Sequence, residues 1–174
     1  GVAEDRGVVV RSLASREAFG GLCREVWPMA VVMLAAFDRV IVETVGVGQR
    51  DVDVTFAVDL TCLALPPAAG DVSQFMKAGI MEIPDVIATT KADLASLAAP
   101  MPDAVSATTG LAAVPVVQTS AARGHGIDEV IQILDRRHAR IVASGQVSRR
   151  RLEARQRWIA RELAEEFGRY GLDR

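Results

Sequence analysis

The chain has 174 residues, of which 50% are hydrophobic, and a formal net charge of −2 at pH 7. This length allows one domain with a packed core and is too short for two large domains. A slightly negative charge gives no electrostatic basis for nucleic-acid binding. No apolar run approaches the roughly 20 residues that cross a bilayer, and the N-terminus has no signal-peptide pattern, so we expect a cytoplasmic protein with no part in a membrane.

The two cysteines, Cys23 and Cys62, lie far apart in apolar contexts. This arrangement predicts free thiols in a reducing compartment and not a disulfide framework. Neither cysteine has a histidine at metal-ligand spacing, so the sequence gives no indication of a zinc site.

The first predicted elements are a strand and a helix. Three consecutive β-branched residues predict a strand at Val8–Val10. Apolar residues recur at helical spacing from about Leu22 to Ala36 and predict a helix there. Pro28 lies inside this pattern, so we expect it to kink the helix or to place the helix start near Trp27.

The next predicted strand, Val40–Val42, is an unbroken β-branched run, which is typical of a parallel strand covered on both faces. Glu43 and Thr44 follow at its end, and Gly46 and Gly48 let the backbone approach a ligand closely. Ligands of open α/β sheets bind at the carboxyl ends of the strands. A carboxylate, a hydroxyl and a Gly-rich turn at that place suit a hydrated cation beside a phosphate, although an ordinary tight turn would use the same residues.

A further strand is predicted at Val58–Leu65, followed by a helix from Val72 to Met81 with Asp71 as its N-cap. Asp71, Gln74 and Lys77 are three residues apart and therefore share one face of that helix. This face is either a contact surface for a partner or a solvated polar face.

Two more strands end in polar residues. Val86–Thr89 is followed by Thr90-Lys91-Ala92-Asp93, and Val114–Thr119 is followed by Ser120-Ala121. Three strand ends with polar residues in this order describe the nucleotide-binding side of a GTPase. Alternatively, Asp93 caps a short helix that begins at Leu94.

The C-terminal part of the chain predicts two helices. Apolar residues at helical spacing from Ile127 to Val142 indicate the first, which Ser144-Gly145 ends. The second runs from Val147 to Tyr170. Its apolar face needs cover from the sheet or from a second subunit, and consists of Leu152, Ile159, Leu163, Phe167 and Tyr170. Residues 99–113 predict a loop, and His125 is interpreted as a loop residue.

Three stretches carry a family resemblance: Glu43-Thr44-Val45-Gly46-Val47-Gly48-Gln49, the segment from Gly70 to Glu82, and Thr90-Lys91-Ala92-Asp93. They resemble the MeaB/ArgK-like GTPases, a branch of the P-loop GTPases that includes metal-insertion chaperones. The resemblance implies an α/β fold with a mostly parallel sheet and flanking helices, P-loop NTPase-like but incomplete, plus a C-terminal helical arm. It implies a partial G domain over residues 1–145 and the arm over residues 146–174.

The same resemblance implies a function. The family uses GTP and GDP with Mg²⁺ and acts as a chaperone of the cobalamin-dependent methylmalonyl-CoA mutase, so this mutase or a related acyl-CoA mutase is the implied partner. Family members form dimers through the C-terminal arm, which implies a homodimer here.

Site residues are implied where the sequence matches the family motifs. Glu43 would hold Mg²⁺ through water, Gly46 would give its amide to the γ-phosphate, and Gln49 would orient the attacking water. Thr90, Lys91 and Asp93 would recognise guanine, and the backbone of Ser120-Ala121 would contact the guanine carbonyl. A mobile third switch that signals to the mutase would include Asp71, Gln74 and Lys77.

Some positions depart from the family pattern. Thr90 stands where asparagine is usual, and Arg50 stands where a serine is usual. The 174 residues contain no Gly-x-x-x-x-Gly-Lys motif, because the only lysines are Lys77 and Lys91. We therefore expect a fragment that begins inside the domain, with negligible GTP turnover by itself.

Two other functions stay open. The chain could be a non-enzymatic interaction module derived from such a GTPase, which keeps the third switch and the C-terminal arm for partner contact. It could also be an unrelated α/β domain such as a receiver, but Asp38, Glu43 and Asp59 do not form an evident acidic cluster in the sequence.

Overall fold

The computed structural model describes residues 5, 7–13, 22–44, 54–66, 84–94 and 114–168. They belong to two compact units, Gly1–Val54 and Thr55–Arg174, and each unit is described by itself. The division into a G domain over 1–145 and an arm over 146–174 stays a prediction.

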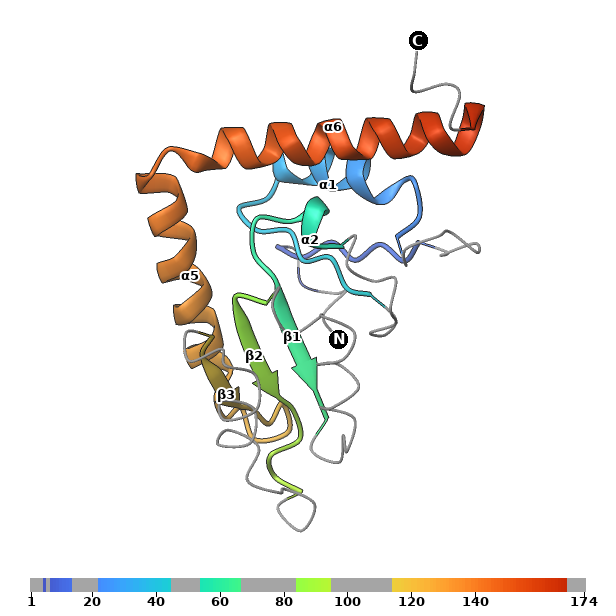
Figure 1. The fold of residues 1–174 in the computed structure, drawn as a ribbon. Helices are drawn as coiled ribbons and strands as arrows, with labels where there is room; N and C mark the ends of the chain where they lie inside the picture. The colour runs from blue at the N-terminus through green and yellow to red at the C-terminus, as the bar shows by residue number, and fades with distance from the viewer. Residues whose placement is uncertain are drawn as a thin grey trace. The chain divides into compact units, whose positions relative to one another are not determined.

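The second unit is built on a three-stranded parallel sheet in the order β1-β2-β3 (Figure 1). Its strands are β1, Cys62–Leu65; β2, Val86–Thr89; and β3, Val116–Gln118. All four residues of the central strand β2 are buried, whereas β1 alternates between exposed and buried residues. This difference explains why β2 has a continuous apolar run, since a central parallel strand is covered on both faces.

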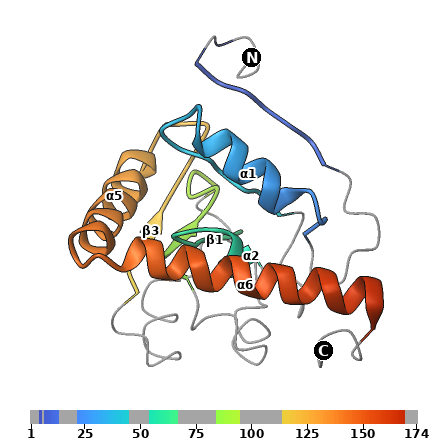
Figure 2. The same ribbon diagram turned by 90° about the horizontal axis from the view of Figure 1, so that it is seen from above.

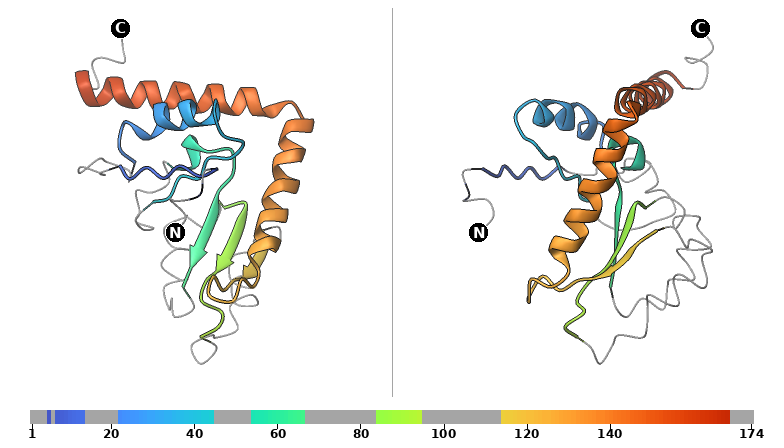
Figure 3. Two further views of the ribbon diagram at one scale, coloured as in Figure 1. Left: turned by 180° about the vertical axis from the view of Figure 1, so that it is seen from behind. Right: turned by 90° about the vertical axis from the view of Figure 1, so that its left-hand side faces the viewer.

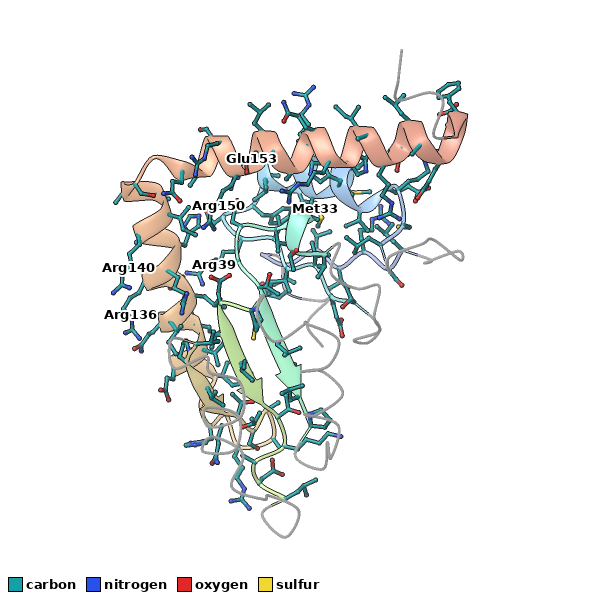
Figure 4. The ribbon with its side chains drawn as sticks, viewed as in Figure 1. Met33, Arg39, Arg136, Arg140, Arg150 and Glu153 are labelled. Carbon is teal, nitrogen blue, oxygen red and sulfur yellow. The ribbon has the colours of Figure 1, made fainter. Side chains whose placement is uncertain are left out.

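Helix α5, Ile127–Ala143, supplies the cover for one face of this sheet (Figure 3). Its buried Ile133 packs with Val86 of β2 and Val117 of β3, and Val130 and Leu134 extend the cluster. Burying one such side chain fully is worth about 1.5–3 kcal/mol, so this cluster holds helix and sheet together. On the outer side of the helix, Arg136 and Arg140 point away from the sheet (Figure 4).

Helix α6, Gln146–Phe167, follows α5 directly. Gly145 between them has φ 67°, a left-handed conformation that glycine adopts without steric cost, and the chain changes direction there (Figure 2). The second helix of the predicted pair is therefore confirmed nearly over its full predicted length.

Two arginines connect these helices to the amino-terminal side of the strands. Arg151 of α6 binds both carboxylate oxygens of Asp59, with distances of 3.0 Å from Nε to Oδ1 and 2.5 Å from Nη2 to Oδ2. Arg137 of α5 lies 3.5 Å from Asp85, whose other oxygen accepts the amide of Thr61 at 2.9 Å. The bidentate Arg151 contact is the stronger of the two because two parallel hydrogen bonds fix the geometry.

The first unit contains one helix among its described residues, α1, Val26–Leu34. The predicted helix over Leu22–Ala36 is confirmed with shorter bounds. Pro28 is the third residue of α1 and therefore lies in the first turn, where the missing amide proton costs no intrahelical hydrogen bond. The start of the helix, and not a kink, accommodates the proline.

Three strand predictions need correction. Val40–Val42 and Val8–Val10 are not strands, and no described residue pairs with them. Ile41 is 92% exposed, so the cover expected on both faces is missing. β-branched residues only favour extended backbone, and a strand also needs a neighbour with which to form hydrogen bonds. Of the strand predicted at Val58–Leu65, only the last four residues form β1, and the short helix α2, Val54–Ala57, precedes them.

Candidate functional site

The candidate site lies at the carboxyl ends of the parallel strands, where the segments after β2 and β3 come together. Residues 90–94 follow β2, and residues 119–126 follow β3. The amide of Ala92 donates to the carbonyl of Thr119 at 3.0 Å, so the two segments are bonded to each other through their backbones. Ligands of parallel α/β sheets bind at this edge.

Asp93 is the acidic group of the site. The buried hydroxyl of Ser120, 1% exposed, donates to Oδ1 of Asp93 at 2.5 Å and accepts the amide of Arg123 at 3.3 Å. The bond from Ser120 lowers the pKa of Asp93, with further contributions from the backbone amide of Asp93 and from the positive charges of Arg123 and Lys91. An ionised carboxylate has about four lone-pair positions, so it can accept hydrogen bonds from a ligand while Ser120 holds it.

Lys91 has φ 56° and is the one described residue other than glycine with positive φ. This conformation costs a residue with a Cβ roughly 1–2 kcal/mol, and such strain is concentrated at functional sites. The carbonyl of Lys91 accepts the amide of Leu94 at 3.0 Å, which closes a tight turn around Asp93. The side chain of Lys91 is exposed, as a group that covers a ligand would be.

Thr90 precedes this turn and is bonded to the neighbouring strand. Its amide and its hydroxyl both donate to the carbonyl of Leu65, the last residue of β1, at 2.8 and 3.2 Å. Thr90 therefore uses its side chain inside the protein, in a contact that its position in the motif did not predict.

The segment after β3 is a compact turn. Ser120 and His125 exchange two backbone hydrogen bonds, of 2.9 and 3.0 Å, and Ala121 lies exposed between them. Gly126 follows with φ 72°, and a Cβ at this position would lie 2.1 Å from the carbonyl oxygen of Gln118. Only glycine fits here, so Gly126 fixes how the turn returns to the sheet.

The remaining predicted site residues do not belong to the described part of the second unit. Glu43 is exposed in the first unit, Gly46 and Gln49 lie outside the described residues, and so does the whole predicted third switch. That switch contains Asp71, Gln74 and Lys77. The alternative helix after Asp93 also extends into residues that the structure does not describe.

A magnesium ion can be tested against Glu43. Within the described ranges, no three histidine, cysteine or acidic residues gather as a metal cluster. Mg²⁺ in phosphate sites keeps several waters and takes only one or two carboxylates together with phosphate oxygens. A single exposed carboxylate such as Glu43 fits that mode of binding through water.

Sequence reasoning missed the hydroxyl contacts of the threonines that flank the site, and it missed the requirement for Gly126. Both have a signal in retrospect. Thr89 is the last residue of β2 and Thr119 directly follows β3, two positions where valine would fill the same volume, and Gly126 directly precedes a helical pattern.

A parallel sheet with helices, a Thr-Lys-Ala-Asp turn after one strand and a serine turn after the next agree with a P-loop NTPase-like α/β protein. The model of the family "Methylmalonyl Co-A mutase-associated GTPase MeaB" matches residues 1–169. The chain belongs to this family.

Individual relatives agree with the family assignment. A Pyrococcus abyssi protein that is provisionally named a GTPase is 44% identical over 91 residues, covering 51% of this chain and 28% of the relative. The mouse methylmalonic aciduria type A homolog, mitochondrial, is 31% identical over 170 residues, covering 91% of this chain and 40% of the relative. A Mycobacterium tuberculosis protein named a probable GTPase is 31% identical over 159 residues, covering 86% of this chain and 47% of the relative. The matched stretch spans less than half the length of each of these relatives.

Among the residues that the structure describes, no helix has the length and apolar character needed to span a bilayer.

Proposed function

We propose that this chain provides the guanine-recognition and switch portion of a GTPase that assists a cobalamin-dependent methylmalonyl-CoA mutase or a related acyl-CoA mutase. Membership in the MeaB family supports the reaction class and the partner. The observation that carries the nucleotide assignment is the Asp93 carboxylate, held by buried Ser120 at the carboxyl end of a parallel sheet.

Guanine recognition by Asp93 follows from hydrogen-bond chemistry. Guanine presents a ring N–H and an exocyclic amine side by side, and one carboxylate accepts both. Adenine lacks this pair of donors, so it would leave the carboxylate without the two hydrogen bonds from the base. A missing partner in a desolvated site costs about 1–3 kcal/mol per group, which is enough to select one base over the other.

The other residues take supporting roles in this proposal. The aliphatic part of Lys91 covers the base, and the backbone at Ala121 contacts the guanine carbonyl. Glu43 holds Mg²⁺ through water, Gly46 donates its amide to the γ-phosphate, and Gln49 orients the attacking water. Bound Mg²⁺ would neutralise phosphate charge, and the residues of the chain contribute mainly by positioning.

Equilibrium binding of GDP and ADP to the purified chain in the presence of Mg²⁺ tests the nucleotide assignment. We expect GDP to bind at least about tenfold more tightly than ADP, and Asp93→Ala to remove this difference while leaving the protein folded. Ser144→Ala, a change to a serine on the far end of α5, is the matched control and should leave binding unchanged. Equal binding of the two nucleotides by the unaltered chain would refute the assignment.

A second candidate is a non-enzymatic interaction module. It is favoured by one sequence fact: the 174 residues contain no Gly-x-x-x-x-Gly-Lys motif for the triphosphate. We expect negligible GTP turnover by this chain and retained affinity for the mutase. Turnover at the rate of complete relatives would contradict the module, and so would failure to bind the mutase in any nucleotide state.

For the assembly, we propose a homodimer through α6 and contact with the mutase through Asp71, Gln74 and Lys77. The exposed apolar side chains on α6 support the dimer, and they are Leu152, Ile159, Leu163 and Phe167. Sedimentation velocity tests it, because Leu163→Glu should then convert dimer to monomer. A monomeric parent chain at micromolar concentration would exclude this role for α6. Residence in the cytoplasm stays a prediction.

A further inference from the structure

We infer that three threonine hydroxyls act as a positioning device for Asp93. The group, called here the threonine brace, consists of the side chains of Thr89, Thr90 and Thr119. It rests on the proposed function, because what it positions is the carboxylate proposed to recognise guanine. It also accounts for Thr90, which stands where the family has asparagine.

The brace links all three strands at their carboxyl ends. The hydroxyl of Thr90 donates to the carbonyl of Leu65 on β1 at 3.2 Å, in addition to the Thr90 amide at 2.8 Å. The hydroxyl of Thr89 donates to the carbonyl of Val117 on β3 at 3.3 Å. The hydroxyl of Thr119 donates to the carbonyl of Thr89 at 3.2 Å, in addition to the Thr119 amide at 2.7 Å.

These contacts continue without interruption to Asp93. Thr119 accepts the amide of Ala92, which is the residue before Asp93, at 3.0 Å. Ser120, the residue after Thr119, donates to the Asp93 carboxylate. The position of Asp93 therefore depends on the register between the ends of β2 and β3, which the hydroxyls of Thr89 and Thr119 reinforce beyond the backbone ladder. It also depends on the first residue of the turn, Thr90, which its hydroxyl ties to the end of β1.

Strand propensity alone does not explain these residues. Thr89 and Thr119 are each only 4% exposed, and valine would fill the same space without a polar group to desolvate. A buried hydroxyl is tolerated when it is bonded, and all three are bonded to carbonyls of neighbouring strands at one edge of the sheet. The usual asparagine at position 90 would anchor this turn through its side-chain amide. Here the hydroxyl of Thr90 anchors the turn instead, through its hydrogen bond to Leu65 of β1.

Base selectivity within one nucleotide class provides the sharp test. GDP and IDP differ only in the exocyclic amine that Asp93 is proposed to accept, so the ratio of their dissociation constants reports the placement of the carboxylate. Loss of folded protein would change both constants equally and leave the ratio unaltered. In the unaltered chain we expect the dissociation constant of IDP to be about ten times that of GDP.

Thr90→Val removes one hydroxyl at constant volume, and we expect the ratio to fall to about three or less. Thr90→Ser keeps the hydroxyl and should restore the ratio of the unaltered chain. The matched control is Thr61→Val at the opposite end of β1, whose backbone amide already binds Asp85, and it should leave the ratio unchanged. An unchanged ratio in Thr90→Val, or failure of Thr90→Ser to restore it, would overturn the inference.

Hydrogen exchange of the Ala92 amide separates this inference from the proposed function. Because that amide is bonded to Thr119, loosening the brace should accelerate its exchange at least about fivefold in Thr90→Val and not in Thr61→Val. If the unaltered chain binds neither GDP nor IDP, the proposed function fails, and the exchange rate still decides whether the brace holds the turn. Equal exchange in both variants would overturn the brace.

Discussion

Replacing Gly126 by alanine is expected to destabilise the second unit far more than the same change at Gly124, two residues earlier. Both glycines have positive φ, 72° and 64°, so each replacement incurs the cost of a left-handed backbone, roughly 1–2 kcal/mol. The surroundings differ. A Cβ on Gly126 would lie 2.1 Å from the carbonyl oxygen of Gln118, whereas a Cβ on Gly124 meets nothing within 4 Å.

The backbone contact at Gly126 cannot be relieved by rotating a side chain. Either β3 or the start of α5 must move, which adds about 1–3 kcal/mol as for other overpacked sites. We therefore expect a loss in the free energy of unfolding of about 2–5 kcal/mol for Gly126→Ala and about 1–2 kcal/mol for Gly124→Ala. Urea denaturation followed by circular dichroism measures both, and the midpoint should fall at constant slope.

Gly126 also closes the turn that carries Ser120, so the altered protein should bind GDP more weakly even under conditions where it is folded. Equal destabilisation by the two replacements would refute the reasoning, because backbone conformation would then account for the whole effect. If Gly126→Ala were as stable as the unaltered protein, the carbonyl of Gln118 could not lie as close to position 126 as the structure has it.

Two further predictions concern the packing of α5 and α6. Ile133→Ala should lower the free energy of unfolding by about 2–5 kcal/mol because it leaves a cavity in the core, while Ile131→Ala, at a 39% exposed position, should cost much less; urea denaturation compares them. Arg151→Met should cost about 0.5–1 kcal/mol at pH 7, and Arg155→Met, at an exposed position on the same helix, should cost nothing measurable. Hydrogen bonding to Arg151 lowers the pKa of Asp59, so this stabilisation is present above the ordinary aspartate pKa of about 3.9 and disappears as the pH falls through the lower pKa of the folded state. A cost of Arg151→Met that stays constant down to pH 2 would contradict this assignment.

Local sequence patterns were sufficient for several elements. The apolar run Val86–Thr89 coincides with β2, and the helical periods after Ile127 and Val147 correspond to α5 and α6. In each case one short pattern predicts both the backbone conformation and the burial. A central parallel strand is a continuous apolar run, and a helix that covers a sheet has apolar residues at helical spacing. The motif residues Asp93 and Ser120 were placed at strand ends for the same reason.

Patterns failed where the outcome depends on a partner far away in the chain. Val40–Val42 has the composition of a strand, yet Ile41 is 92% exposed, because composition does not supply the neighbouring strand that pairing requires. Asp59, expected inside a strand, instead lies before β1 and binds Arg151 from 92 residues away. No local rule anticipates a contact of that range.

The sequence by itself determined the family, the position of the Thr-Lys-Ala-Asp motif after a strand, and the existence of the central strand and the two C-terminal helices. Tertiary structure alone decided that Ser120 holds Asp93, that Thr90 is anchored on Leu65, and that only glycine fits at position 126. The physical reason is that residue type and period act over a few neighbouring positions. The contacts of Thr90 and Ser120 instead join residues 25 and 27 positions apart through the register of parallel strands, and the requirement for glycine at position 126 depends on how the turn after β3 returns to Gln118.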